Sequence, residues 1–494
     1  MDTIPLDDYQ AIRPLESSVS IRQSDQMAEE EKVDMFRAPV NRSMRALDRS
    51  FFQKVVPLKA ARIFDNKNIS KVRQELERSK DALHQERLGS VFPDPDPERA
   101  KTGKKCVLLR PQAPAAKDDA DGDATILHSA ILDELAKQEL ISVIPYDLHL
   151  DYTYWTYHDI MSAILPSDSQ GEIPSGFSQV GHVAHLNLRD EYLKYKYLIA
   201  EILVDKNAGV RTVINKIDDV GEENEFRTFR YEVLAGPDDL NVEVSEEGCL
   251  FRFDYSKVYW NSRLNTEHRR LVALFKEGEA VCDVMAGIGP FAVPAGKKRI
   301  FCWANDLNPE SFASLQDAVA RNKVQDYVRP FNEDGMKFVP RSAAALLESD
   351  RKVEIVSRPS RKEAKANPEP QALKTLHEPK VFSHYVMNLP ATAITFLPSF
   401  IGLYPPELRA KLPEGTQMPL VHVYCFSTKS DDNVEEGIKI CEEISRQLDF
   451  TMKPGKIEDG AVEVHDVRDV APKKRMFCAS FRLPEEVAFR TRGG

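Results

Sequence analysis

Apolar runs alternate with helical stretches through the C-terminal half of the chain. A helix is predicted over residues 266–275. Seven apolar runs typical of strands follow it, near Val281, Ile300, Val328, Val381, Leu420, Val462 and Met476. Helical stretches separate these runs, except the last two, which adjoin. The alternation predicts an α/β domain over residues 261–494, built on a Rossmann-like sheet of seven strands.

Two smaller α+β domains are predicted before this sheet. The first covers residues 51–150 and contains a helix with alternating charges. The second covers residues 151–260, where a helix over residues 189–203 lies among β-type runs. Residues 1–50 form a tail, first acidic and then basic, that lacks the pattern of a packed element, so disorder is predicted there.

A polar stretch interrupts the C-terminal domain between residues 341 and 380. It contains nine basic and six acidic residues, four prolines and no aromatic side chain. Ordering such a segment costs more chain entropy than its few apolar groups return on burial. The sequence therefore predicts a flexible insertion between two strands, and a basic flap that closes over RNA is the alternative.

Composition excludes several classes of protein. No apolar run approaches the roughly 20 residues of a membrane span, so a soluble protein is expected. The seven cysteines include no Cys-x-x-Cys pair, which favours neither a metal site nor disulfides and fits a reducing compartment. The net charge is -11, and residues 1–35 with the acidic run at residues 118–123 supply 10 of these charges. The remainder is nearly neutral, which permits a local basic face.

The stretch Asp283-Val-Met-Ala-Gly-Ile-Gly-Pro-Phe291 has the form of a strand followed by a cofactor-binding turn. Gly287 and Gly289 permit a positive φ and let a ligand approach the backbone, and Pro290 suits a first helical position. Asp306 stands 17 residues after Gly289, near the roughly 20 expected of an acid that binds a ribose diol. Without that acid, the two glycines would indicate only a tight turn.

The same turn indicates the kind of cofactor. Ala292 replaces the third glycine of the dinucleotide fingerprint, which favours the S-adenosylmethionine of a methyltransferase over NAD, because no pyrophosphate needs the longer glycine cradle. Two later strand ends carry polar groups. Asp334-Gly335 suits an adenine edge, with a plain turn as the alternative, and Asn388-Leu-Pro390 suits a planar acceptor group held beside a methyl donor.

Four segments together resemble the eukaryotic and archaeal class of tRNA (guanine-N1)-methyltransferases, which act on the guanosine 3′ of the anticodon. They are residues 181–189, Phe226-Arg227 with residues 232–236, residues 253–268, and Asp283 to Phe291 with Asn388-Leu-Pro390. The resemblance runs from about residue 151 to the C-terminus, apart from the insertion. It implies a monomer that binds tRNA, partly through its N-terminal domain, in the cytoplasm and nucleus with a mitochondrial matrix pool.

The resemblance also implies roles for single residues. S-adenosylmethionine contacts are implied at His268, Asp306, Leu307, Asp334, Gly335 and Asn388. The cofactor turn adds Asp283, Gly287 and Gly289 to this set. Guanine N1 carries a proton that must leave before methyl transfer, and negative charge then moves onto O6. Glu267 matches the family's base, Arg227 matches its O6 partner, and Tyr259 with Asn388 borders the target base.

Simpler interpretations exist for several of these residues. Glu267 also suits the start of a helix, where a carboxylate offsets the dipole by typically 0.3–1 kcal/mol. Tyr259 next to Trp260 also suits a core position. Three arginines are predicted to contact RNA phosphates, with plain solvation as the alternative: Arg263, Arg269 and Arg270.

Two rival functions share parts of this pattern. An aminocarboxypropyl transferase of the wyosine pathway uses the same cofactor and fold, but the proline of Asn388-Leu-Pro390 speaks against it. A non-catalytic tRNA-binding protein is the rival from another class. The joint presence of Glu267, Arg227 and Asn388 argues against such a loss of catalysis.

Overall fold

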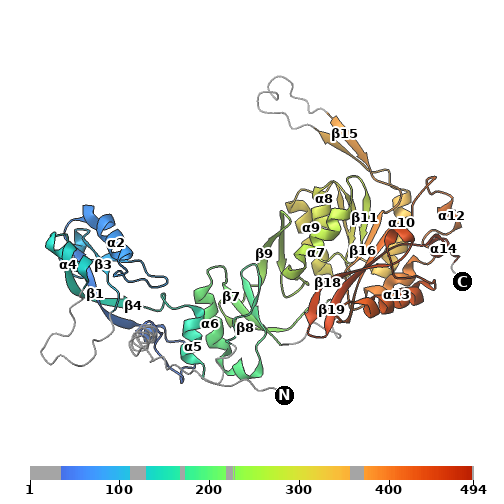
Figure 1. The fold of residues 1–494 in the computed structure, drawn as a ribbon. Coiled ribbons are helices and arrows are strands. Elements are labelled where there is room, and N and C mark those ends of the chain that lie inside the picture. Colours follow the sequence, from blue (N-terminus) through green and yellow to red (C-terminus); the bar gives the residue numbers. More distant parts are fainter. Residues whose placement is uncertain are drawn as a thin grey trace, which may run out of the picture. The chain divides into compact units, whose positions relative to one another are not determined.

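The computed structural model describes residues 35–111, 129–166, 173–217, 226, 228–356 and 372–491. Contacts divide this part of the chain into two compact units (Figure 1). The first takes in the described residues up to Ser175 together with Asp190–Lys206, and the second takes in Gly176–Arg189 and the described residues from Asn207 onward. The predicted boundaries at residues 150 and 260 therefore differ from the observed division, because the intervening segment contributes helices to one unit and strands to the other.

The first unit is built around an antiparallel sheet in the order β2-β3-β1-β4. Its strands are β1 (Lys54–Ile63), β2 (Val91–Pro93), β3 (Lys105–Leu108) and β4 (Ile141–Leu150). Its helices are α2 (Ile69–Arg78), α3 (Pro97–Lys101), α4 (Ala130–Lys137), α5 (Tyr157–Ile164) and α6 (Lys196–Lys206). Residues of β1, β3, α2 and α4 share a buried apolar cluster, which is the core expected of a small α+β domain.

The prediction of a disordered tail over residues 1–50 was wrong for residues 35–50. Residues 1–34 lie outside the described part of the chain, but residues 35–50 pack against the first unit. Met44 is buried there, the Asn41 N–H donates to Ala163 O at 3.0 Å, and the Arg49 guanidinium donates to Asp205 at 2.8 Å. These long-range contacts order a segment whose own sequence carries little apolar periodicity.

The second unit begins with a four-stranded sheet in the order β5-β6-β7-β8 and a separate hairpin, β9–β10. The strands are β5 (Ser178–Val180), β6 (Val183–Leu186), β7 (Thr212–Lys216), β8 (Tyr231–Ala235), β9 (Asn241–Glu246) and β10 (Cys249–Asp254). The hairpin β9–β10 packs on α9 (Pro309–Arg321). The Asn322 amide completes this contact, since it accepts from Leu250 N at 2.9 Å and donates to Leu250 O at 2.8 Å.

The seven predicted C-terminal strands form one sheet, in the order β13-β12-β11-β16-β17-β19-β18. The strands are β11 (Ala280–Asp283), β12 (Phe301–Asn305), β13 (Val328–Phe331), β16 (His384–Met387), β17 (Leu420–Thr428), β18 (Glu463–Ala471) and β19 (Lys474–Arg482). The first five in this order are parallel, and β19 runs antiparallel between β17 and β18. The predicted Rossmann-like sheet is confirmed.

Helices cover both faces of this sheet (Figure 1). One apolar cluster joins the sheet to α7 (Asn265–Leu274), α8 (Ala292–Lys297) and α9. The other joins it to α10 (Gly335–Leu347), the 3-10 segment η6 (Ala393–Phe400), α13 (Val434–Leu448) and α14 (Glu485–Ala488). Because both faces are buried, neighbouring strand positions are all apolar, as in Val281 and Cys282. The short α12 (Pro406–Arg409) follows η6.

The prediction of a flexible insertion over residues 341–380 was wrong for both ends of that range. Its first residues complete α10, and β14 (Lys352–Val356) pairs antiparallel with β15 (Ala372–His377). The buried Glu378 carboxylate anchors the base of this hairpin, because it accepts from Trp303 Nε1 at 2.9 Å and from Ser349 Oγ at 2.5 Å. Residues 357–371 lie outside the described part. Hydrogen bonds thus order the ends of a segment with few apolar groups.

Within the described ranges, none of the helices has the length and apolar character needed to cross a membrane.

Candidate cofactor pocket

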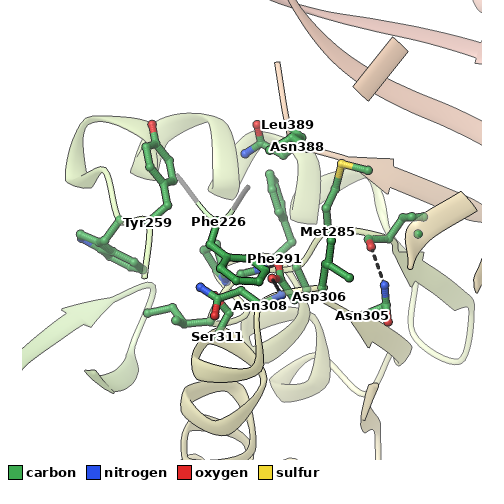
Figure 2. Close-up of a pocket in the computed structure, with 18 of the residues that line it drawn as sticks. Phe226, Tyr259, Met285, Phe291, Asn305, Asp306, Asn308, Ser311, Asn388 and Leu389 are labelled. Atoms are coloured by element: carbon green, nitrogen blue, oxygen red, sulfur yellow. Dashed lines mark hydrogen bonds between the residues drawn. The ribbon is translucent and has the colours of Figure 1, made fainter. Parts of the chain in front are cut away.

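A pocket lies at the carboxyl ends of β11, β12, β13 and β16. It encloses about 1170 Å³, including its open mouth, whereas roughly 300–1,000 Å³ suffices for most small organic ligands. The neighbours of β11 lead away from it in opposite directions along the sheet, and such a switch point is where open α/β sheets bind ligands. In Figure 2, Tyr259 and Asn388 border one side of the pocket, and Asp306, Asn308 and Ser311 border the other.

Two glycines shape the turn after β11, and each is required for a different structural reason. Gly287 has φ +56°, and a Cβ placed on it would meet no atom within 4 Å, so its bare backbone faces the pocket. Gly289 has φ +94°, and a Cβ there would lie 2.6 Å from Leu315 Cδ1 and 2.9 Å from Val293 Cγ2. Gly289 does not line the pocket. It is needed because α8 and α9 press against the turn.

The Asp306 carboxylate joins this turn to the end of β12. The Gly287 N–H donates to Asp306 Oδ2 at 2.7 Å, and the Asn308 N–H donates to Oδ1 at 2.9 Å. Burial raises the pKa of Asp306, and the two backbone donors oppose that shift. A carboxylate offers about four acceptor positions. Asp306 therefore keeps acceptor capacity on both oxygens for a ligand in the pocket.

Asn305 braces the strand ends around the pocket, a role that the sequence analysis missed. Its side-chain amide donates to Val284 O at 3.0 Å and to Glu333 O at 2.9 Å, and its Oδ1 accepts from Glu333 N at 2.9 Å. Asn332 adds a second brace, since its amide donates to Asp306 O at 2.7 Å. The turns that follow β11, β12 and β13 are thus tied together before any ligand binds.

The predicted pair Asp334-Gly335 lies at the start of α10. Asp334 caps this helix by accepting from Met336 N at 2.8 Å, and a Cβ on Gly335 would lie 3.1 Å from Val284 Cγ1 and 3.2 Å from Phe396 Cε1. Both residues line the pocket. Leu307 and Met336 line it too and are 44% and 42% exposed, which gives the pocket an apolar wall suited to a flat ring.

Asp283 does not line the pocket, contrary to the prediction that it contacts the cofactor. Its side chain is fully buried, and neither carboxylate oxygen has a hydrogen-bond partner among the described residues. Burial, and then the charge of Asp306, raise the pKa of Asp283 well above the ordinary value. Asp283 is the last residue of β11, in a sheet that is covered by helices on both faces, which accounts for the burial of its side chain.

The opposite side of the pocket is aromatic. Tyr259 lines it and is 43% exposed, so the alternative of a core position is wrong for this residue. Trp260 takes the core position instead, with its ring centroid 5.5 Å from those of Phe251 and Phe253. Asn388 follows β16 and lines the pocket across from Asp306 (Figure 2).

Glu267 is buried behind this pocket rather than in its lining. Arg270 binds its carboxylate through two hydrogen bonds, Nε to Oε2 at 2.6 Å and Nη2 to Oε1 at 2.7 Å. The Tyr424 hydroxyl donates to Oε1 at 2.6 Å, and the Tyr424 ring lies 6.1 Å from that of Phe291, which lines the pocket. Arg227, the predicted O6 partner, lies outside the described residues.

The three arginines predicted to contact RNA have different surroundings. Arg270 donates to the Glu267 carboxylate. Arg269 is exposed and donates to the Glu247 carboxylate at 2.7 Å. Arg263 is exposed, and its guanidinium lies 3.5 Å from Ser178 Oγ. Contact with RNA stays a prediction for all three.

Most of the predicted cofactor residues meet at this pocket. Those that line it are His268, Gly287, Asp306, Leu307, Asp334, Gly335 and Asn388. Several lining residues were not predicted: Phe226, Asn261, Met285, Asn305, Asn308 and Phe396. The Asn308-Pro309 pair is a recognisable helix start and would have indicated Asn308. Met285 belongs to the Asp283–Phe291 motif, whereas Phe396 carries no such signal, because tertiary packing alone brings it to the pocket.

Comparisons with known proteins agree with this geometry. Residues 157–239 match the family described as the TYW2 N-terminal domain, and residues 242–351 match the TRM5/TYW2 methyltransferase domain. The chain is 52% identical over 466 residues to the tRNA (guanine(37)-N(1))-methyltransferase of Fusarium vanettenii, covering 93% of this chain and 98% of the relative. It is 54% identical over 465 residues to the tRNA (guanine(37)-N(1))-methyltransferase of Neurospora crassa, covering 93% and 96%.

Solved structures show the same fold at lower identity. A complex of aTrm5 and tRNALeu aligns with a TM-score of 0.52 and 19% identity, covering 86% of this chain and 100% of that one. Trm5b from Pyrococcus abyssi aligns with a TM-score of 0.50 and 20% identity, covering 86% and 99%.

The two glycines of the turn give a prediction for stability. Gly289→Ala should lower the free energy of unfolding by about 1–3 kcal/mol more than Gly287→Ala, because only at Gly289 does the new methyl overlap neighbouring side chains. Both variants share the strain of alanine at positive φ, so Gly287→Ala is the matched control. Urea unfolding measures both, and equal losses would contradict the assigned packing role of Gly289.

The buried Asp283 carboxyl gives a prediction for pH. Its folded-state pKa is raised, so the stability that it contributes is present below its unfolded pKa of about 4 and is lost as pH rises through the folded value. Asn cannot ionise. The stability of Asp283→Asn relative to the wild type should therefore increase between pH 4.5 and 8, measured by urea unfolding. Asp317→Asn on the exposed face of α9 is the control, and a constant difference for Asp283→Asn would refute the account.

Proposed function

Since the chain belongs to the family of tRNA (guanine(37)-N(1))-methyltransferases, we propose that it transfers a methyl group from S-adenosylmethionine to N1 of guanosine 37 in tRNA. The observation that carries this proposal is the pocket in which the Gly287 turn, Asp306 and Asn388 meet at one sheet edge. The full-length relatives, about half identical to this chain, carry that activity in their names.

The pocket residues fit S-adenosylmethionine. Gly287 leaves space that a side chain would fill, and the free acceptor positions of Asp306 suit the two hydroxyls of a ribose. The apolar wall of Leu307 and Met336 suits the adenine ring, and the Asp334-Gly335 turn suits its polar edge. When bound, this cofactor supplies a methyl group on a positively charged sulfur.

Asn388 and Tyr259 are the residues that we propose to receive the guanine. A stacked base cannot present its N1 atom, so the guanosine must leave the anticodon loop stack at a cost of a few kcal/mol. The exposed Tyr259 ring offers a face on which the extruded base can stack. The Asn388 turn is fixed in place because Pro390 O accepts from Phe426 N at 3.1 Å. Its amide can therefore hold the guanine edge in a defined orientation.

Glu267 is the proposed general base, and its contacts define how it must act. Arg270 balances the carboxylate charge, while Arg270 and Tyr424 occupy both oxygens. Glu267 precedes His268, which lines the pocket, and its partner Tyr424 lies 6.1 Å from the ring of Phe291, which also lines it. We propose that Glu267 leaves one of these hydrogen bonds to take the N1 proton. The role of Arg227 at O6 rests on the resemblance.

The wyosine-pathway transferase remains the nearest alternative, because the matching domain families are named for both kinds of enzyme. The relatives at 52–54% identity favour methylation. We further propose, from the resemblance, that the protein is a monomer and acts in the cytoplasm and nucleus with a mitochondrial pool.

Mass spectrometry of a tRNA transcript tests the proposed function. The full chain is incubated with S-adenosylmethionine and a transcript that carries G37, and with a matched transcript that carries A37. We expect a mass gain of one methyl group on the G37 transcript, mapped by nuclease digestion to position 37. A gain of one aminocarboxypropyl group, or no gain with tRNA still bound, would replace the proposal with one of its two rivals.

Removal of the base should separate chemistry from binding. Glu267→Gln should lower the methyl-transfer rate by roughly 10²- to 10⁴-fold, because an amide cannot accept the N1 proton. S-adenosylmethionine affinity, measured by calorimetry, should stay within about threefold of the wild type, since Glu267 does not line the pocket. Glu247→Gln, which alters a nearby exposed pair, is the control. Wild-type turnover in Glu267→Gln would remove this residue from the mechanism.

A further inference from the structure

A buried acid–imidazole pair lies at the edge of the pocket. His268 Nδ1 is 2.5 Å from Glu246 Oε1, and both side chains are more than nine-tenths buried, with 4% and 8% of their surfaces exposed. Glu246 is the last residue of β9, whereas His268 belongs to α7, so the pair links the β9–β10 hairpin to the helix that borders the pocket.

This contact fixes the orientation of the imidazole. A carboxylate only accepts hydrogen bonds, so the proton of the contact belongs to His268 Nδ1. The Phe291 ring packs against the imidazole edge-on, with centroids 4.8 Å apart, and limits rotation. His268 lines the pocket, and its Nδ1 edge faces Glu246, so the opposite edge with Nε2 is left for the cavity. No described residue supplies Nε2 with a hydrogen-bond partner.

The charges of the pocket lining indicate what Nε2 binds. Asp306 and Asp334 are its two acidic residues, and among the described lining residues His268 is the one side chain that can carry a positive charge. S-adenosylmethionine has one anionic group, the α-carboxylate of its methionine part. A buried anion without a partner is costly, whereas a hydrogen bond to a charged donor is among the stronger ones that proteins make.

We propose, resting on the proposed function, that Glu246 is a positioning residue. It holds His268 so that Nε2 donates to the α-carboxylate of S-adenosylmethionine. With Glu246 balancing the ring's charge, the imidazole donates from both nitrogens at once. The pocket thereby distinguishes ligands with the carboxylate from those without it, because removal of the anion leaves a buried donor unpaired.

The chain offers a matched control one residue away. Glu247 pairs with Arg269 at 2.7 Å, so two consecutive acids of the hairpin meet two consecutive basic residues of α7. The Glu247–Arg269 pair is exposed, and neither residue lines the pocket. Glu247→Gln therefore changes the same hairpin end by the same chemistry without touching the proposed contact.

Calorimetry with two ligands tests the proposal on the full chain. S-adenosylmethionine and decarboxylated S-adenosylmethionine differ only in the carboxylate. The wild type should bind the former roughly ten- to a hundredfold more tightly. His268→Asn, which keeps a donor for Glu246 but loses Nε2, and Glu246→Gln should each reduce this ratio to below about threefold. Glu247→Gln should leave the ratio at the wild-type value.

Each outcome decides between the alternatives. Two results would overturn the proposed role of Glu246: a wild-type affinity ratio near one, or an unchanged ratio in both Glu246→Gln and His268→Asn. Neither result would contradict the proposed methyl-transfer function. Failure of the wild type to bind either ligand would instead overturn the proposed function. If Glu246→Gln does not fold, ¹⁵N NMR of the wild-type imidazole still applies. We expect a protonated Nδ1, and an Nε2 resonance that moves only with the carboxylated ligand; an Nδ1 without its proton would contradict the assigned orientation.

Discussion

The carboxylate of Asp306 holds together two of the turns from which the pocket is made. It accepts one hydrogen bond from the turn after β11, at Gly287 N, and one from the turn after β12, at Asn308 N. Gly287 needs a left-handed conformation to expose its backbone, and the Asp306 bond fixes that conformation before a ligand arrives. The other polar features of the pocket, including the Asn305 brace and the Asp334 cap, extend the same arrangement along the sheet edge.

The β9–β10 hairpin has a larger part in this pocket than its place in the chain suggests. It packs on α9 through the Asn322 amide and brings Glu246 against His268 on α7. A domain boundary at residue 260 separates this hairpin from the pocket residue His268 that it contacts. The matched methyltransferase family begins at residue 242 and includes the hairpin from Val242 onward. On the same helix, Glu267 is held by Arg270 and Tyr424, so α7 positions groups for both proposed steps: binding of the cofactor and removal of a proton.

The sequence predicted the sheet and most of the pocket because both depend on local signals. Apolar runs of strand length locate the strands, and polar residues at their carboxyl ends, such as Asp306 and Asn388, fall at one edge by topology alone. Which way a side chain points is a different matter. Asp283 and Gly289 belong to the same motif as Gly287, yet the first is buried in a sheet covered by helices on both faces, and the second packs against α8 and α9. Neither the Tyr424 contact of Glu267 nor the ordered ends of the 341–380 insertion could be predicted, since both depend on residues distant in sequence or on single buried hydrogen bonds.

The central claim is that Asp306 binds the ribose of S-adenosylmethionine while it holds the Gly287 turn. Calorimetric titration of Asp306→Ala with S-adenosylmethionine tests it most directly, with Asp317→Ala on the exposed face of α9 as the control. Loss of two charge-assisted hydrogen bonds to the ribose should weaken binding of the cofactor at least roughly tenfold. Thermal unfolding of the unliganded variant separates this effect from a loss of fold. Wild-type affinity in a folded Asp306→Ala protein would contradict the account.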